Sequence, residues 1–190
     1  MAIKSLNDAV EKLEEYLKLE KSFGLDELEC DPSIFKNFHD EENDNIPLLI
    51  QGKKNKPDIQ FIGIKSNKQQ KNIFENDKGE LLGKIINAMK YTINNVSVVM
   101  VSLEHPRIRK VLSDEIVQTN AKYIVALGDK ISDFIGKEIK HTDKLTENKY
   151  LVHKIPMMKI YDLDYMVNHP ESKKESWKIL QIILKDLENK

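Results

Sequence analysis

Two aspartates separated by one residue, Asp162 and Asp164, follow a short apolar segment in the C-terminal part of the sequence. Carboxylates placed directly after a strand of a doubly wound sheet lie at the edge where such sheets bind their ligands. The pair is therefore a candidate for a metal site or for an acid/base couple. The same spacing is also typical of aspartates that cap a turn or the following helix. We favour this structural interpretation, and the catalytic one stays open.

A second candidate site is the segment His105–Arg109, which follows a β-branched run. Basic side chains at the start of a helix can bind a phosphate, but a capped loop before an exposed basic helix is the slightly preferred interpretation. The other histidines, His39, His141 and His153, lack metal-ligand spacing with each other or with Cys30. Phosphate-loop, dinucleotide-binding, nucleophile-elbow and zinc-protease motifs do not occur. The sequence therefore predicts no metal site.

The composition is that of a soluble globular domain. The chain has 190 residues, of which 40% are hydrophobic and 32% charged, so it can bury a three-layer core and is not typical of a disordered protein. The longest apolar runs, Val98–Val101 and Ile124–Leu127, are far shorter than the roughly 20 residues of a membrane span. The single cysteine excludes an intrachain disulfide and agrees with a reducing compartment. We therefore predict a cytoplasmic protein with no membrane partner.

The charge pattern gives no strong signal for nucleic acid. The formal net charge is −1, and only Arg107 and Arg109 among the 30 basic residues are arginines. If DNA is bound, the candidate phosphate contacts are Lys65, Lys68 and these two arginines, in loops at neighbouring strand ends. A solvated, lysine-rich surface is the simpler interpretation. Any DNA binding is expected to be weak and nonspecific.

Hydrophobic periodicity predicts one α/β domain over residues 1–190. A helix over residues 5–17 and a long surface connection to residue 52, with a short helix near residues 33–38, precede the core at residues 57–188. Between the strands, helices are expected near Gly79, Ile108 and Asp129, and the last helix carries Trp177. Strands alternating with helices favour a three-layer α/β/α sandwich around a mostly parallel sheet of about four strands. These strands are Ile59–Gly63, Val96–Val101, Tyr123–Leu127 and Met157–Tyr161, with a further short strand at Tyr150–Val152.

The last thirty residues resemble the C-terminal motif of bacterial and archaeal uracil-DNA glycosylases. In that family a His-Pro-Ser/Ala-Tyr-Leu-Leu-x-Asn-Pro-Glu run ends a strand and leads into the final helix. Ala121–Ile131 is also similar to the family's Pro-Lys-x-Ile-Val-Ala-Leu-Gly strand and the helix after it. The resemblance covers about residues 57–188 and is closest to the iron-sulfur type. The packing half of the C-terminal motif is present as Tyr165, Met166, Val167, Pro170 and Glu171, and His169 falls on a turn position before the proline.

The resemblance places the ligand pocket at Gly63, Ile64, Phe74, Met100 and Asp162. Gly63 and Phe74 match the family's turn glycine and uracil-stacking phenylalanine. Ile64 stands where the family has an acidic residue, Met100 where an asparagine reads the uracil edge, and Asp162 where it has its histidine. The cluster-binding cysteines have no counterparts, and one cysteine cannot hold a four-thiolate cluster. The resemblance therefore implies a pocket without the family's chemistry, and no cofactor.

Three functions are consistent with these residues. The leading hypothesis is a catalytically degenerate glycosylase-like protein that acts as a binding or protein-interaction module in DNA replication or repair. The alternative is an active DNA glycosylase with a rewired site that uses Asp162, Asp164, Phe74 or Ser66 to excise uracil or another base. A weaker third hypothesis is a nucleotide or small-ligand binder that uses the same cleft at the strand ends. Fold alone does not decide among them.

Overall fold

The computed structural model describes residues 47–65, 71–146 and 148–189. The chain divides into two units, residues 1–42 and 43–190, and every described residue belongs to the second. The predicted helices at residues 5–17 and 33–38 lie outside the described residues, as does Lys68. One domain spanning the whole chain stays a prediction.

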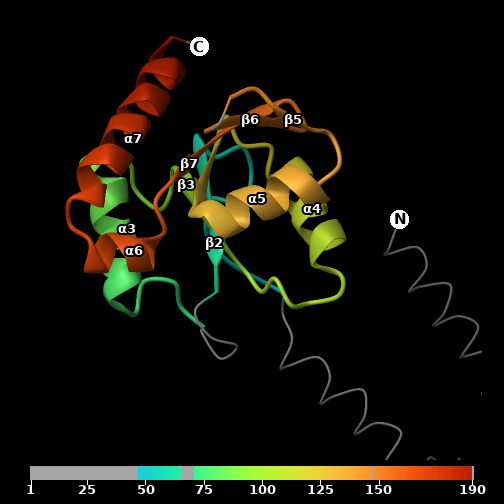
Figure 1. Cartoon of the computed structure of the whole chain (residues 1–190), viewed down its shortest axis with the longest axis horizontal. Helices are drawn as coiled ribbons and strands as arrows, with labels where there is room; N and C mark the ends of the chain where they lie inside the picture. Colours follow the sequence, from blue (N-terminus) through green and yellow to red (C-terminus); the bar gives the residue numbers. More distant parts are fainter. Residues whose placement is uncertain (1–46, 66–70, 147, 190) are drawn as a thin grey trace, which may run out of the picture. The chain divides into compact units, whose positions relative to one another are not determined.

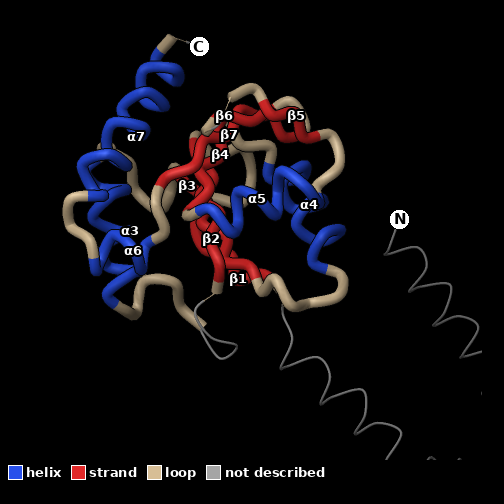
Figure 2. Tube along the Cα trace, viewed as in Figure 1, coloured by secondary structure: helices blue, strands red, loops and turns tan. Residues whose placement is uncertain are grey.

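A single sheet of seven strands forms the centre of the described unit (Figure 2). Its spatial order is β1-β3-β2-β4-β7-β6-β5. The inner strands β3, β2, β4 and β7 are parallel, whereas β1, β6 and β5 join the sheet antiparallel. The strands are β1 Leu48–Gly52, β2 Ile59–Ile64, β3 Val96–Val101, β4 Tyr123–Leu127, β5 Thr142–Lys144, β6 Lys149–Val152 and β7 Ile155–Ile160.

The α/β class is confirmed, but the prediction of about four, mostly parallel strands is wrong. The sheet has seven strands, and three of the six pairings between described strands are antiparallel. β1 lies where a surface connection was expected, and it pairs with β3 so that Leu48 faces Val101. β6 and β7 are joined by only two residues, His153 and Lys154, and a two-residue connection can join only antiparallel strands.

Helices cover both faces of the sheet, which gives three layers. They are α3 Asp77–Ala88, α4 Ile108–Thr119, α5 Asp129–Glu138, α6 Leu163–Asn168 and α7 Ser172–Glu188. Figure 1 shows α3, α6 and α7 on one side of the sheet and α4 and α5 on the other. Side chains along each inner strand alternate between the two cores: Phe61 of β2 packs under α3 and α7, whereas Ile62 packs under α4 and α5. Both faces of the inner strands are therefore buried.

The direction of winding reverses at β2. The chain runs from β2 through α3 to β3 on one side, and then through α4 on the opposite face to β4 on the other side of β2. In open α/β sheets such a reversal leaves a crevice at the carboxyl ends of the two strands on either side of it, which here are β2 and β4. None of the helices in the described part of the chain is both long and apolar enough to span a membrane.

The start of α3 depends on close backbone packing. Asn76 is the N-cap, and its side-chain oxygen accepts a hydrogen bond of 2.9 Å from the Gly79 amide. A Cβ atom on Gly79 would overlap the backbone oxygen of Ile73 and lie 2.5 Å from the Cα atom of Phe74. Gly79 is therefore needed where the loop after β2 turns into the helix.

We expect Gly79→Ala to destabilise the fold by about 1–3 kcal/mol, because backbone atoms cannot move aside cheaply. Gly83→Ala is the matched control in the same helix, since its Cβ would meet only Phe74 Cδ1, at 3.9 Å. That change should stabilise the protein by roughly 0.5–1 kcal/mol through helix propensity. The free energy of unfolding in urea measures both. Equal effects of the two substitutions would contradict the described packing.

Candidate functional site

A cleft of about 1130 Å³ opens at the carboxyl ends of the parallel strands. Its floor comes from Gly63 and Ile64 of β2, Met100 of β3, Leu127 of β4 and Ile160 of β7. Its walls come from the start of α3, the first turn of α5, and α6 with the segments that flank it. The cleft thus lies at the reversal of winding, where doubly wound sheets bind ligands.

The floor of the cleft is apolar where the resemblance predicts base recognition. Gly63 leaves space for its neighbours: a Cβ atom there would lie 2.9 Å from Met100 Sδ and 3.1 Å from Leu127 Cδ1. Met100 is only 5% exposed and packs into the core under α3 and α7. A thioether is a weak acceptor and donates no hydrogen bond. The floor therefore offers a surface for apolar contact and no group that can read the edge of a base.

Asp162 is the N-cap of α6. Its Oδ1 atom accepts a hydrogen bond of 2.8 Å from the Asp164 amide. Gly128, directly after β4, leaves space for Asp162. It has a φ of +103°, and a Cβ atom there would lie 2.9 Å from Asp162 Cβ. This is the helix-capping arrangement that the spacing of the two aspartates favoured.

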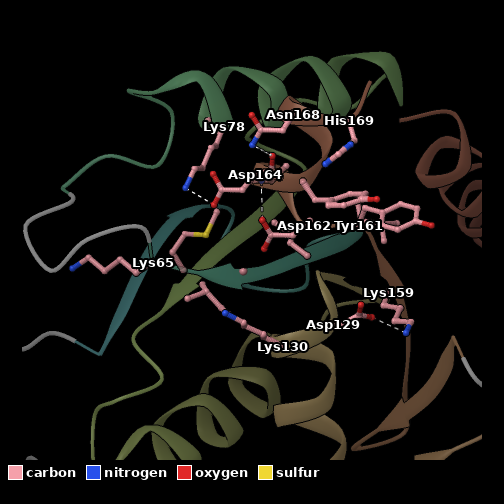
Figure 3. Close-up of a pocket in the computed structure, with 18 of the residues that line it drawn as sticks. Lys65, Lys78, Asp129, Lys130, Lys159, Tyr161, Asp162, Asp164, Asn168 and His169 are labelled. Carbon is pink, nitrogen blue, oxygen red and sulfur yellow. Dashed lines mark hydrogen bonds and ion pairs between the residues drawn. The ribbon is translucent and has the colours of Figure 1, made fainter. Parts of the chain in front are cut away.

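Asp164 also has structural partners. Its carboxylate forms an ion pair with Lys78 of α3, and its backbone oxygen accepts a hydrogen bond of 2.9 Å from Asn168 Nδ2. Figure 3 shows Lys78, Asp164 and Asn168 gathered above Asp162 on one side of the cleft. Asp164 therefore joins α6 to α3, whereas Asp162 caps the start of α6.

Among the described residues, the charges around the cleft are balanced. Across from α6, Lys159 of β7 donates a hydrogen bond of 2.8 Å to Asp129 at the start of α5, and this bond raises the pKa of Lys159 (Figure 3). The positive lining residues are Lys65, Lys78, Lys130 and Lys159, and the negative ones are Asp129, Asp162, Asp164 and Glu175. A lining with equal numbers of lysines and carboxylates does not attract a polyanion through net charge.

Three aromatic rings stack along the rim. The Tyr161 and Tyr165 rings are 5.3 Å apart with 23° between their planes, and the Tyr165 and His169 rings are 4.3 Å apart with 27° between theirs. Sequence reasoning gave Tyr165 a packing role and His169 a turn. The missed signal is their regular spacing of four residues, although only Tyr165 lies within α6, since Tyr161 precedes its N-cap and His169 is its C-cap.

The other candidate residues are spread over the molecule. Lys65 lines the cleft. Phe74 is partly buried and packs into the core under α3 and α7, near Gly83. Arg109 lies on α4, where its Nε atom is 2.8 Å from Glu138 Oε2, and Arg107 is the residue before that helix. Of the predicted phosphate contacts that the structure describes, Lys65 therefore lines the cleft and the two arginines do not.

A second cavity, of about 310 Å³, lies beside α4 and the turn between β6 and β7. Ser113 Oγ and His153 Nε2 are 3.0 Å apart, and the rings of His141 and His153 are 5.5 Å apart. Pairing of β5 with β6 brings these histidines together although they are distant in sequence. Within the described residues, no three ligand-type side chains are grouped so that they could hold a metal ion.

Comparisons with known proteins add no family assignment. No family model matches the chain, and no curated protein matches it. The resemblance to uracil-DNA glycosylases stays a prediction that rests on the residues quoted above.

Removing the Asp162 cap should loosen α6. We expect Asp162→Ala to lower the free energy of unfolding by about 0.5–2 kcal/mol, because the Asp164 amide loses its acceptor. Asp162→Asn keeps a capping oxygen and should be within a few tenths of a kcal/mol of the unaltered protein. Chemical denaturation of the three proteins measures the difference. Equal loss in both variants would show that charge, and not capping, is what Asp162 contributes.

His153 should make stability depend on pH. Burial, followed by the charge of His141, lowers the pKa of His153 below 6.5. The His153 ring therefore binds a proton more readily in the unfolded chain than in the folded protein. The stability that the neutral ring contributes is complete above about pH 7, and it is lost as the pH falls from 6.5 through the lower pKa of the folded protein. His153→Gln should flatten the decline in unfolding free energy between about pH 7.5 and 5.5. An unchanged decline in the variant would contradict this prediction.

Proposed function

We propose that this chain is a catalytically degenerate member of the uracil-DNA glycosylase superfamily. It acts as a binding or protein-interaction module in DNA replication or repair. One observation carries the proposal: a ligand-sized cleft lies at the strand ends where the family binds its base, while its floor and walls hold Met100, Ile64 and Asp162. The proposal is thus that the chain keeps the cavity and lacks the residues that carry out the family's chemistry.

The arrangement of the strands supports the relationship. The segments that resemble the family include β2, β3, β4 and β7, and these four are adjacent and parallel. Gly63, the one retained residue of the family's loop after the first strand, lines the cleft and is packed against Met100 and Leu127. A fold can be kept while its activity is lost, so the function depends on the groups in the cleft.

Those groups do not fit base excision. Excision requires hydrogen bonds to the edge of a flipped base and stabilisation of the anion that leaves. Met100 cannot supply the first, and a carboxylate at Asp162 opposes the second. At about 4 Å and an effective dielectric near 20, two like charges repel by roughly 4 kcal/mol, which corresponds to about a thousandfold in rate. The capping bond to the Asp164 amide holds Asp162 in this position.

The cluster of the iron-sulfur glycosylases does not fit this chain either. Its ligands are four thiolates, and the sequence contains one cysteine, Cys30. No step of the proposed function involves a metal.

The partner is DNA, bound weakly, or a replication or repair protein. Lys65 lines the cleft, and Arg109 must give up its bond to Glu138 before it can bind a phosphate. Each phosphate neutralised adds about 0.7–0.9 to the salt dependence of affinity, so few available cations mean weak binding at physiological salt. A protein partner does not need a basic surface.

The proposal predicts that the purified protein releases no uracil above background from single- or double-stranded DNA and contains no iron. Asp162→His alone should not create activity, because Met100 still cannot bind the base edge. A gel assay for abasic sites, with a known glycosylase as positive control, measures the release, and elemental analysis measures the iron. Excision by the unaltered protein would overturn the proposal in favour of a glycosylase with a rewired site.

A further inference from the structure

The two margins of the sheet differ in how their outer edges are protected. An edge strand exposes backbone N–H and C=O groups that can pair with a further strand, and short length, charged side chains or proline prevent this. β5, at one margin, has three residues, of which Asp143 and Lys144 are exposed. β1, at the other margin, has five residues, Leu-Leu-Ile-Gln-Gly, without a charge or a proline (Figure 2). The edge of β1 therefore lacks the protection that β5 has.

Hydrogen bonds at its two ends show how β1 is paired with β3. The Ser102 amide donates a bond of 2.9 Å to the Pro47 oxygen, and the Lys53 amide donates one of 2.8 Å to the Val96 oxygen. In an antiparallel pair, residues that bond the neighbouring strand alternate with residues whose backbone groups point away from it. Every second residue from Pro47 to Lys53 therefore bonds β3.

Leu48 and Ile50 are intervening residues, so their N–H and C=O groups point to the outer edge of β1. No strand among the described residues pairs with that edge. The side chains are incompletely covered too: Leu49 and Ile50 are half-buried, and each packs partly against one of the two cores. A further strand beside β1 would satisfy the backbone groups and cover apolar surface on both faces of the sheet.

The charges that flank β1 in the sequence are opposite in sign. Lys53, Lys54 and Lys56 follow the strand and are exposed. Residues 40–44, Asp-Glu-Glu-Asn-Asp, precede it. Antiparallel pairing of two identical strands brings the start of each beside the end of the other, so opposite charges meet at both ends. A second copy of this chain therefore complements β1 in charge.

We propose that two copies of this chain associate through β1, which pairs antiparallel with β1 of the second copy about a twofold axis. In the register that satisfies the outward groups, Leu48 lies opposite Ile50 of the second copy, and Leu49 lies opposite its own counterpart. The same residues then serve both copies, as a twofold contact requires. A contact of one strand pair is small, so we expect a weak dimer that dissociates on dilution. β1 lies outside residues 57–188, so the inference does not depend on the proposed function.

Sedimentation velocity at protein concentrations from about 1 μM to about 1 mM tests the association. The double substitution Lys53→Glu and Lys54→Glu places like charges together. It should raise the dissociation constant at least about tenfold, since each exposed ion pair contributes up to about fivefold. The matched control, Lys140→Glu with Lys144→Glu near the other margin, changes the net charge equally and should dimerise like the unaltered protein. Equal affinity in both double variants, or a monomer at every concentration, overturns the inference.

Amide hydrogen exchange of the full chain locates the contact. The Ile50 amide should exchange slowly where the dimer predominates and lose its protection on dilution, whereas the Leu49 amide, bonded to β3, should stay protected. Ile50→Pro removes the outward N–H and should abolish the dimer, and Ile50→Val keeps it and should dimerise normally. Urea unfolding checks that the proline variant is folded, and the exchange measurement does not require that variant.

Two other results overturn the inference. Slow exchange at Ile50 in a monomer would assign the edge of β1 to another segment of the same chain. A dimer whose Ile50 amide exchanges freely would assign the contact to another surface.

Discussion

The structure depends on the position of β2, which is enclosed on every side. Its neighbours β3 and β4 occupy both of its edges, and helices cover both of its faces, so Ile59, Phe61 and Ile62 are fully buried. A strand in this position cannot be exposed at either face, and the chain must pass over both faces to supply the cover. The winding therefore reverses at β2, and the reversal places the ends of β2 and β4 beside an open cleft. Burial of one strand thus determines where the cleft lies.

The inner part of this arrangement was predictable from sequence. Val96–Val101 and Tyr123–Leu127 are short, β-branched or apolar runs that suit a strand covered on both faces, and both are strands within those bounds. The outer strands carry weaker signals. β5, with the sequence Thr-Asp-Lys, has no apolar side chain, and it is a strand because β6 pairs with it. The turn between β6 and β7 uses His153 and Lys154 at φ values of +47° and +70°, where glycine or asparagine is the usual signal.

The site was harder to predict because its side chains are brought together by the fold. The spacing of Asp162 and Asp164 did indicate a helix cap. Their contacts with Lys78 and Gly128 depend on how α3 and the end of β4 approach α6, and no local pattern contains that information. The contact between the His141 and His153 rings likewise depends on the pairing of β5 with β6. In contrast, Tyr161, Tyr165 and His169 are close in sequence, and their regular spacing could have been noticed.

Met100 gives the cleft a floor made of a flexible side chain. A methionine has three rotatable side-chain bonds and fills irregular space without a fixed shape. Gly63 contributes no side chain of its own, so the depth of the cleft at this point is set by the conformation of Met100 and the neighbouring Leu127. During evolution, the depth of the cavity at this point could therefore change through substitution of Met100 while the sheet stays unchanged.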